Sequence, residues 1–572
     1  MEYKVKYAPL RDFYSIKELL ETSANDTPDK YAFCYKKGGE VVNVTYKDFR
    51  HTTLALGTAL SERGLTEGHI ACISENRYDW IVAYLTVLQS KTVFIPIDAE
   101  LPQSGIEHIL DAGDARICFC SEKYEKRFTE SEGDLSKIEY FISFDREEHD
   151  GKYLSMPRLI EEGEKLLAEG STKFTDETRD EYAVKLISYT SGTTGISKGV
   201  MLSEHNIVSC IKYGLQVAHV YDKTLSVLPY HHTYEAIPAI LVELRCNVTI
   251  CLNDSRAATL RNMLLFKPEH IYLVPAFVDV FYKKVWENID KQGKTETIKA
   301  AIKVSNGLRK IGIDVRRKLF SAIHKAFGGE LKLIVCGGAP LRAEVAEFFD
   351  AIGIALLNGY GITECSPLVS VNQEETNDPN TVGYTLPCIE VKIDNPNEEG
   401  HGEICVKGDI VMMGYYKNEE ETKNVLTEDG WFHTGDYGMI NDRGQLCITG
   451  RKKNLIVLKN GKNIYPEEIE NYIASIKYIK EVMVYAIEEN GQEVALCAEV
   501  YPDKATVEEM GITGDLAERL KADIKNATTE LPVYKQISKV IVRDHEFVKT
   551  TTNKIKRQAP ENKTLDKYAL LC

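Results

Sequence analysis

Short apolar runs alternate with amphipathic stretches along most of the chain. Residues 69–74, 92–97 and 117–120 are apolar runs of strand length, whereas residues 78–89 repeat apolar side chains at helical spacing. Strands that alternate with helices are typical of α/β layers. The pattern therefore predicts an α/β fold in which helices cover layered β-sheets.

The pattern changes near residue 450. Before this point, short strands and turns over 402–406 and 444–448 indicate a β-rich subdomain. Beyond it, the spacing predicts helices over 466–474 and 516–531 and strands over 482–488 and 494–500. We therefore expect a large N-terminal domain over 1–450, a short connection over 451–454, and a small α+β domain over 455–572.

One long polar segment, residues 285–327, is rich in lysine and has helical spacing. Two interpretations stay open at this point. The segment is either a solvated helical excursion on the surface, or a lid or membrane-facing element.

Composition and charge exclude one broad class of function. The chain has 572 residues, of which 43% are hydrophobic and 27% are charged, as in ordinary folded proteins of at least two domains. Its net charge of −16 argues against a nucleic-acid partner, which would need a basic footprint.

Cysteine usage and hydropathy predict a soluble, cytoplasmic protein. The 14 cysteines include no C-x-x-C pair, which is typical of free thiols in a reducing compartment. The N-terminus lacks an apolar core of signal-peptide length, and no apolar run reaches the roughly 18 residues of a transmembrane helix. Peripheral contact with a membrane stays open.

The strongest chemical signal is YTSGTTGISKGV, residues 189–200. Its glycines allow backbone N–H groups to approach an anion, its hydroxyl side chains add donors, and Lys198 adds positive charge. A Walker A loop would need G-x-x-x-x-G-K-[ST], but Ser197 stands five residues after Gly192. The segment therefore predicts a polyphosphate site of another class.

Six separated segments together resemble one superfamily. They are YTSGTTGISKGV, LPYHHTYE (228–235), CGGAP (336–340), NGYGITECSP (358–367), WFHTGDYG with GRKK (431–438 and 450–453), and KTTTNKIKR (549–557). In this order they resemble the adenylate-forming superfamily of acyl-CoA synthetases, peptide-synthetase adenylation domains and luciferases. Within it, the chain is similar to long-chain fatty-acid–CoA ligases.

The resemblance implies an ATP site with magnesium. The glycine loop would wrap the β- and γ-phosphates, and Thr190 with Glu364 would hold Mg²⁺, which prefers one or two carboxylates beside phosphate oxygens. Asp436, assisted by Arg451, would hold the ribose hydroxyls. The full implied set for the nucleotide is Thr190, Ser191, Gly192, Thr193, Thr194, Gly195, Lys198, Gly338, Ala339, Pro340, Asn358, Gly359, Tyr360, Gly361, Thr363, Asp436, Arg451 and Lys554.

The resemblance also implies the catalytic residues. Lys554 would be the adenylation lysine, and His232 would lie beside the α-phosphate and the acyl carboxylate, with the adjacent His231 as its natural control. Thr363 would lie near the α-phosphate and Glu364 would act through the metal.

A mobile C-terminal domain is a further implication. Lys453 stands at the hinge position, where the family often has Asp, and Gly461 would line the channel for the pantetheine arm of coenzyme A. Asn553 replaces the family's Gly before Lys554, and Asn tolerates the left-handed backbone.

The expected activity is ATP-dependent activation of a medium- to long-chain fatty acid through acyl-AMP, followed by transfer to coenzyme A. ATP, Mg²⁺ and coenzyme A would be the cofactors and co-substrates. Three alternatives stay open: loading of a carrier protein, ligation of an aromatic or other carboxylic acid to coenzyme A, and nucleotide binding without catalysis.

Overall fold

Two structural units divide the chain in the computed structural model. The residues described are 7–131, 133–191, 197–459, 462–489, 492–549 and 554–564. The first unit reaches Val391 and adds Val406–Phe432 and Asp442–Leu446, and the second comprises Lys392–Cys405, His433–Asn441 and the chain from Cys447. Segments 392–405 and 433–441 were expected with the N-terminal domain. They group with the second unit because their strands share a sheet with β21 (Leu446–Arg451). The hinge at 451–454 stays a prediction.

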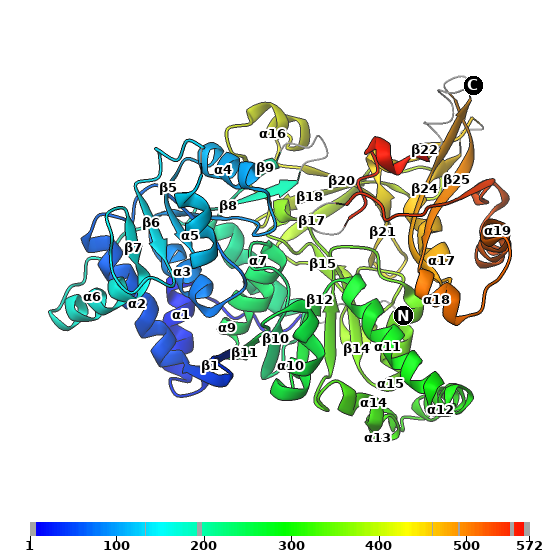
Figure 1. The fold of residues 1–572 in the computed structure, drawn as a ribbon, viewed down its shortest axis with the longest axis horizontal. Coiled ribbons are helices and arrows are strands. Elements are labelled where there is room, and N and C mark those ends of the chain that lie inside the picture. The colour runs from blue at the N-terminus through cyan, green and yellow to red at the C-terminus, as the bar shows by residue number, and fades with distance from the viewer. Residues whose placement is uncertain are drawn as a thin grey trace. The chain divides into compact units, whose positions relative to one another are not determined.

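An eight-stranded sheet forms one part of the first unit (Figure 1). Its strand order is β19-β9-β8-β4-β3-β5-β6-β7. The strands are β3 (His69–Ile73), β4 (Val93–Pro96), β5 (Ala115–Cys120), β6 (Tyr140–Ser143), β7 (Tyr153–Ser155), β8 (Val184–Ser191), β9 (Ser197–Ser203) and β19 (Gly414–Tyr415). The strands predicted over 69–74, 92–97 and 117–120 are confirmed as β3, β4 and β5. These three run parallel to one another, and their side chains are almost all buried, as expected for a parallel sheet covered on both faces.

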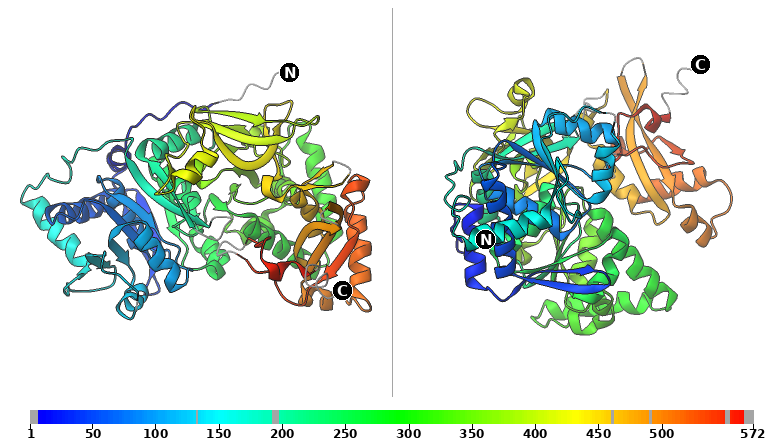
Figure 2. Two further views of the ribbon diagram at one scale, coloured as in Figure 1. Left: turned by 90° about the horizontal axis from the view of Figure 1, so that it is seen from above. Right: turned by 60° about the vertical axis from the view of Figure 1, so that its left-hand side comes forward.

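Seven helices accompany this sheet in the described residues. They are α1 (Ile16–Asp26), α2 (Tyr46–Glu62), α3 (Tyr78–Leu88), α4 (Gln103–Ala112), α5 (Glu122–Thr129), α6 (Met156–Ala168) and α7 (Glu204–Val217). The helix predicted over 78–89 is confirmed as α3, which packs on β3 and β4, while α4 and α5 pack on β5. The blue and cyan helices of this part of the chain lie against its strands in both views of Figure 2. Ser203 begins α7 with a capping box, in which its hydroxyl accepts from the N–H of Asn206 at 3.1 Å.

A nine-stranded sheet forms the other part of the first unit, in the order β16-β15-β14-β13-β12-β10-β11-β1-β2. The strands are β1 (Tyr31–Lys37), β2 (Glu40–Thr45), β10 (Lys223–Ser226), β11 (Thr249–Leu252), β12 (His270–Leu273), β13 (Leu333–Cys336), β14 (Ala355–Tyr360), β15 (Ser370–Val371) and β16 (Tyr384–Thr385). Strands β1 and β10–β14 run parallel to one another, so their carboxyl ends meet at one edge, whereas β2 and β15 pair antiparallel with β1 and β14.

The remaining helices of the first unit follow these strands. They are α8 (Thr233–Ala236), a π-helix (Ile237–Val242), α9 (Glu243–Arg245), α10 (Thr259–Phe266), α11 (Pro275–Lys291), α12 (Thr295–Arg309), α13 (Arg316–Leu319), α14 (Ser321–Ala326), α15 (Ala343–Ile352) and α16 (Glu419–Val425), with 3₁₀ turns at Arg256–Ala258, Thr363–Cys365 and Glu374–Thr376. The lysine-rich segment expected as one helical stretch is broken into four helices. Gly293 and Gly312 adopt φ of 65° and 83°, which end α11 and α12 because an L side chain rarely adopts such angles.

The second unit contains a four-stranded and a three-stranded sheet. Its elements are β17 (Ile389–Asp394), β18 (Gly402–Gly408), β20 (Phe432–Ile440), β21, β22 (Ile456–Val457), β23 (Asn463–Ile464), α17 (Pro466–Ala474), β24 (Ile479–Glu489), β25 (Gln492–Pro502), α18 (Lys504–Glu509), α19 (Leu516–Ala527) and β26 (Lys539–Val542), with 3₁₀ turns at Lys452–Asn454, Val533–Lys535 and Pro560–Asn562. The predicted helix over 466–474 is confirmed as α17. The helix predicted over 516–531 ends earlier, at Ala527, because the hydroxyl of Thr528 donates to the carbonyl of Ile524 and the chain turns there.

No helix among the described residues is both long and apolar enough to cross a lipid bilayer. The predicted α/β fold class is confirmed.

Candidate active site

Three of the six motifs leave the same edge of the nine-stranded sheet. LPYHHTYE follows β10, CGGAP closes β13, and NGYG closes β14. These strands are parallel, with Leu273 of β12 opposite Cys336 and Cys336 opposite Asn358, so their carboxyl ends lie together. In open α/β sheets, ligands bind outside this edge. The topology therefore brings the predicted adenine and acyl motifs to one place.

Tyr234 ties the histidine motif to the CGGAP turn. Its hydroxyl donates to the carbonyl of Val335 at 3.1 Å. Its ring also lies beside Gly337, where a Cβ would meet it at 3.5 Å. His232, the predicted catalytic histidine, precedes Tyr234 as the N-cap residue of α8. Gly338, Ala339 and Pro340 are exposed at the end of β13.

His231 and His232 differ in their surroundings. Their ring centroids are 4.1 Å apart. The Nε2 atom of His231 lies 3.7 Å from a carboxylate oxygen of Asp98, and burial, partly opposed by Asp98, lowers the pKa of His231. The control histidine thus lies beside a carboxylate, although its Nε2 atom makes no hydrogen bond to any described residue. The catalytic role of His232 stays a prediction.

A buried carboxyl group anchors the start of α8. Glu235 is fully buried, and its Oε1 atom accepts from the hydroxyl of Ser226 at 2.5 Å and from the N–H of Val227 at 3.1 Å. Its other oxygen has no hydrogen-bond partner within the described part of the chain. Burial raises the pKa of Glu235 to about 8, although the hydrogen bonds oppose this shift. Glu235 therefore joins the end of β10 to the helix that His232 begins.

The NGYG turn is fixed by a close backbone approach. A Cβ on Gly361 would lie 1.6 Å from the carbonyl oxygen of Pro367, so only glycine fits. Asn358 is buried and donates to the carbonyl of Thr381 at 3.4 Å. Tyr360 is buried at the end of β14.

The base of the glycine loop is an antiparallel hairpin of β8 and β9. Thr190 lies directly opposite Lys198 across this hairpin, so their side chains project on the same face. Lys198 forms an ion pair with Glu421, and its ammonium lies 5.2 Å from the ring centroid of Tyr415. An incoming phosphate group would compete with Glu421 for this lysine.

Some predicted loop residues lie outside the described residues. These are Gly192, Thr193, Thr194 and Gly195 of the phosphate loop and Gly461 of the predicted pantetheine channel. Ser191 is described only as the end of β8.

Tyr415 orients the predicted magnesium ligand. Its hydroxyl donates to Oε1 of Glu364 at 3.0 Å, and the turn Thr363–Cys365 packs against β9. Burial and the negative charge of Glu364 raise the pKa of Tyr415, so the phenol stays a donor. One oriented carboxylate and the hydroxyl of Thr190 are hard-oxygen donors of the kind that Mg²⁺ prefers beside phosphate oxygens, and the metal site stays a prediction.

The predicted ribose pair forms within the second unit. Asp436 is buried on β20, and its Oδ1 atom lies 2.8 Å from Nε of Arg451 at the end of β21. The N–H of Asp436 donates to the hydroxyl of Thr434 at 3.0 Å. The guanidinium of Arg451 therefore orients the carboxylate, and the hydroxyl of Thr434 fixes the backbone that carries it.

Two predicted lysines of the second unit lie in the electric field of this pair. Loss of water around the amine, and then the charge of Arg451, lower the pKa of Lys554, whereas Asp436 raises it. The pKa of Lys453 is also lowered, first by burial and then by Arg451 and Arg557. The structure thus brings Lys554, the predicted adenylation lysine, near Asp436 and Arg451, although it is far from both in sequence; Lys453, the predicted hinge residue, stands two residues after Arg451.

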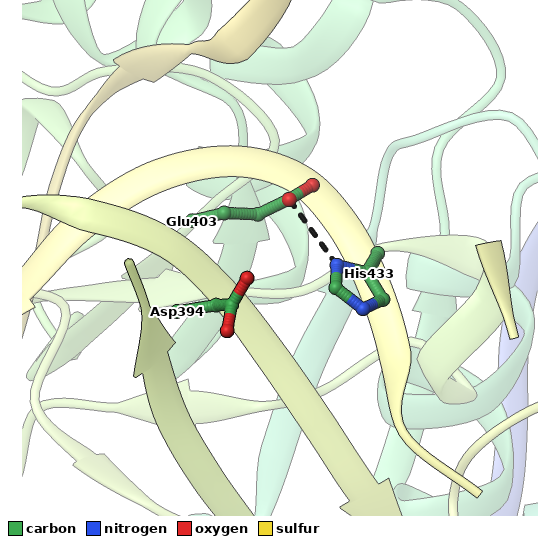
Figure 3. Close-up of side chains that lie close together, drawn as sticks. All are labelled: Asp394, Glu403 and His433. Carbon is green, nitrogen blue, oxygen red and sulfur yellow. Dashed lines mark hydrogen bonds and ion pairs between the residues drawn. The ribbon is translucent and has the colours of Figure 1, made fainter. Parts of the chain in front are cut away.

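A second polar cluster in this unit was not predicted from the sequence. Atoms of Asp394, Glu403 and His433 lie within 4.8 Å of one another, and His433 points at Glu403 (Figure 3). The ammonium of Lys452 lies 2.7 Å from Oε2 of Glu403, the same oxygen that lies 3.2 Å from Nδ1 of His433. Burial of Glu403 is outweighed by Lys452 and His433, so its pKa is lowered. Because Lys452 already supplies the positive charge, we assign no metal to this cluster.

Sequence reasoning missed Tyr415, Glu421 and the anchoring role of Glu235. Glu235 stands inside the histidine motif, and its signal was an acid in an otherwise apolar stretch. The signal for Tyr415 was a Gly-Tyr pair between two recognised motifs. Glu421 stands among other acids of α16, so no local pattern sets it apart.

Comparison with known proteins defines the class. Residues 20–416 match the family model described as AMP-binding enzyme, and residues 453–569 match the AMP-binding enzyme C-terminal domain. The chain belongs to the AMP-binding enzyme family, as its motifs predicted.

Individual relatives show which members of the family the chain is similar to. Long-chain-fatty-acid–CoA ligase 5 of Rattus norvegicus is 29% identical over 472 residues, which cover 77% of this chain and 69% of the relative. Long chain acyl-CoA synthetase 6, peroxisomal, of Arabidopsis thaliana is 28% identical over 551 residues, covering 90% and 77%. The crystal structure of the anthranilate CoA ligase AuaEII with anthranoyl-AMP has a TM-score of 0.74 at 18% identity, covers 96% of both chains, and shares the fold.

Proposed function

We propose that this protein is an AMP-forming ligase that activates a medium- to long-chain fatty acid with ATP and transfers the acyl group to coenzyme A. The observation that carries this proposal is the grouping of Asp436, Arg451 and Lys554 in one electrostatic cluster. The long-chain fatty-acid–CoA ligases among its relatives support the fatty-acid substrate.

The first step must bring two anions together. A carboxylate and a phosphate at about 4 Å repel by roughly 4 kcal/mol at an effective dielectric constant near 20. Lys554 would place one positive charge between them, and His232 would donate to the acid. Thr190 and Glu364 would hold Mg²⁺, which when bound neutralises phosphate charge. In-line attack then gives acyl-AMP and pyrophosphate.

The second step is thioester formation. The coenzyme A thiolate attacks the acyl carbonyl of acyl-AMP, and AMP leaves. We propose that rotation at Lys453 withdraws Lys554 between the steps, and that Gly461 lines the path of the thiol arm. The first unit would carry ATP and the acid, with the N-terminal domain ending near residue 450.

The cellular location of the protein is part of the proposal. No described helix could span a bilayer. We propose a cytoplasmic location, although the name of one relative places that relative in peroxisomes.

Substitution of two neighbouring lysines, one at a time, tests the proposed adenylation step. Lys554→Ala should lower pyrophosphate exchange with ATP and fatty acid by at least about 100-fold, because the charge between the two anions is lost. The same variant should still convert synthetic acyl-AMP and coenzyme A to the thioester. The matched control, Lys556→Ala, removes an exposed lysine two residues away and should keep both activities.

The identity of the substrate is tested with the parent chain, that is, the protein without substitutions. We expect AMP release that requires both fatty acid and coenzyme A, measured across saturated acids of increasing length and benzoate. Equal exchange in the parent and Lys554→Ala would refute the assigned role of this lysine. Thioester formation only on a carrier protein, or only with benzoate, would refute the proposed substrates.

A further inference from the structure

Residues 291–329 concentrate positive charge in an acidic protein. They contain ten Lys and Arg against two Asp and Glu, a net charge of +8, whereas the whole chain carries −16. These residues form α12, α13 and α14, which lie together at the lower edge of the view in Figure 1. A local field of this sign attracts an anionic partner even when the net charge of the protein is negative.

The arginines of this segment make ion pairs and hydrogen bonds within the protein. Arg309 and Arg316 both pair with Asp350 of α15, the latter at 3.0 Å. Arg317 donates to the carbonyl oxygen of Leu331 at 2.7 Å. These cations fasten α12 and α13 to the core and are not available to a partner.

Several lysines of this segment have no such contact. Lys303, Lys310 and Lys318 are exposed and make no ion pair with any residue that the structure describes. They stand in α12, at its C-cap and in α13. Their ammonium groups are therefore free to meet an anionic surface.

Each of these lysines is followed directly by an exposed aliphatic side chain. Val304 is 61% exposed, Ile311 is 71% exposed and Leu319 is 48% exposed, and Ile313 between them is 48% exposed. Soluble proteins rarely gather large aliphatic side chains at such exposure without a partner. The segment therefore offers apolar and cationic groups in alternation.

Helix geometry places Lys303 and Val304 away from the packed side of α12. Ile298, Ala301 and Ile302 pack against the core, so the opposite face points away from it. Lys303 and Val304 are exposed within α12, and Lys310 and Ile311 are exposed directly after its last residue, Arg309. The N–H of Ile311 donates to the carbonyl of Leu308 at 3.1 Å, so the chain makes one more turn there.

We propose that this surface, defined by Lys303, Val304, Lys310, Ile311, Lys318 and Leu319, docks on an anionic lipid bilayer. Lysines that meet lipid headgroups while aliphatic side chains enter the acyl boundary are the pattern of interfacial helices. A nucleic acid would use the charges but leave the aliphatic side chains in water. Of the two interpretations left open by the sequence, the exposed aliphatic side chains favour the membrane-facing one.

The test is co-sedimentation of the full chain with vesicles, without ATP, fatty acid or coenzyme A. We expect binding to vesicles of phosphatidylcholine mixed with phosphatidylglycerol, much weaker binding to phosphatidylcholine alone, and loss of binding with rising salt. Near an anionic surface each lysine contributes about fivefold in partitioning, so the triple variant Lys303→Glu, Lys310→Glu, Lys318→Glu should bind at least about 100-fold more weakly.

A second variant separates the apolar contribution. Val304→Ser with Ile311→Ser keeps every charge and should lower partitioning by at least about tenfold, at high salt as well as at low salt. The matched charge control reverses three exposed lysines elsewhere, Lys47→Glu, Lys165→Glu and Lys521→Glu, and should bind as the parent does. Circular dichroism and the thermal midpoint verify that each variant is folded.

Three results would overturn the proposal. The parent chain could fail to bind the anionic vesicles, the control triple variant could lose as much binding as the patch variant, or the serine variant could bind as the parent does. Tighter binding of the parent to single-stranded RNA than to vesicles, abolished by the same triple variant, would assign the surface to nucleic acid instead.

Discussion

The buried carboxyl group of Glu235 makes the stability of the first unit depend on pH. In the folded chain its pKa is raised from 4.5 to about 8 by burial. The folded state therefore holds a proton that the unfolded state releases between these two values, and stability falls as pH rises through this window. Glu235→Gln removes this titration while keeping an oxygen that accepts from Ser226 and Val227.

The size of the expected stability difference follows from the pKa shift of Glu235. Each pH unit between 4.5 and 8 changes the difference between variant and parent by about 1.4 kcal/mol. At pH 7 the glutamine variant should be more stable by about 3 kcal/mol, and near pH 4.5 the two proteins should be about equal.

Urea unfolding followed by tryptophan fluorescence measures this difference. The chain has three tryptophans, and all belong to the first unit, as does Glu235: Trp80, Trp286 and Trp431. Glu347→Gln removes one carboxylate at an exposed position of α15 and serves as the matched control. A difference between Glu235→Gln and the parent that stays constant from pH 5 to pH 8 would refute the assignment of a buried, protonated carboxyl group.

Three further substitutions test the candidate site. Tyr415→Phe removes a hydrogen bond to Glu364 worth about 1 kcal/mol, so half-maximal adenylation should need about fivefold more Mg²⁺, with little change in kcat at saturation; an unchanged requirement would contradict this contact. Asp436→Asn should raise the KM for ATP. It should also move the alkaline limb of the adenylation pH profile to lower pH, because Asp436 raises the pKa of Lys554. An alkaline limb that moves to higher pH would contradict this effect of Asp436 on Lys554. Gly361→Ala places a Cβ 1.6 Å from a backbone oxygen and should destabilise the first unit by several kcal/mol in urea unfolding, and a neutral result would show that the turn relaxes freely.

Local patterns predicted much of the fold because they report local physics. The apolar runs that became β3, β4 and β5 and the amphipathic stretch that became α3 have the periods of their elements. The segment 285–327 shows the limit. Its polarity hides that Gly293 and Gly312 adopt positive φ and divide it into separate helices.

Contacts between segments that are distant in the chain could not be predicted from sequence patterns. The motifs named Glu364, but its partner Tyr415 approaches only because β19 pairs with β9. In the same way, the sequence gives no sign that Lys452 satisfies Glu403, because that contact depends on two strands and a turn meeting in space. Segments 392–405 and 433–441 also group with the second unit through hydrogen bonding between strands, which their order along the chain does not reveal.

The shared edge of β10, β13 and β14 has a consequence for how such an enzyme changes its choice of acid. The strands are almost wholly inside the protein and fix the framework, while the connections that follow them leave it, as Gly338, Ala339 and Pro340 do after β13, where they are exposed. Replacements in these connections can therefore alter which acid is accepted without unravelling the scaffold beneath. Directed evolution of acyl preference should accordingly collect its useful changes after the strands and leave the strands themselves untouched.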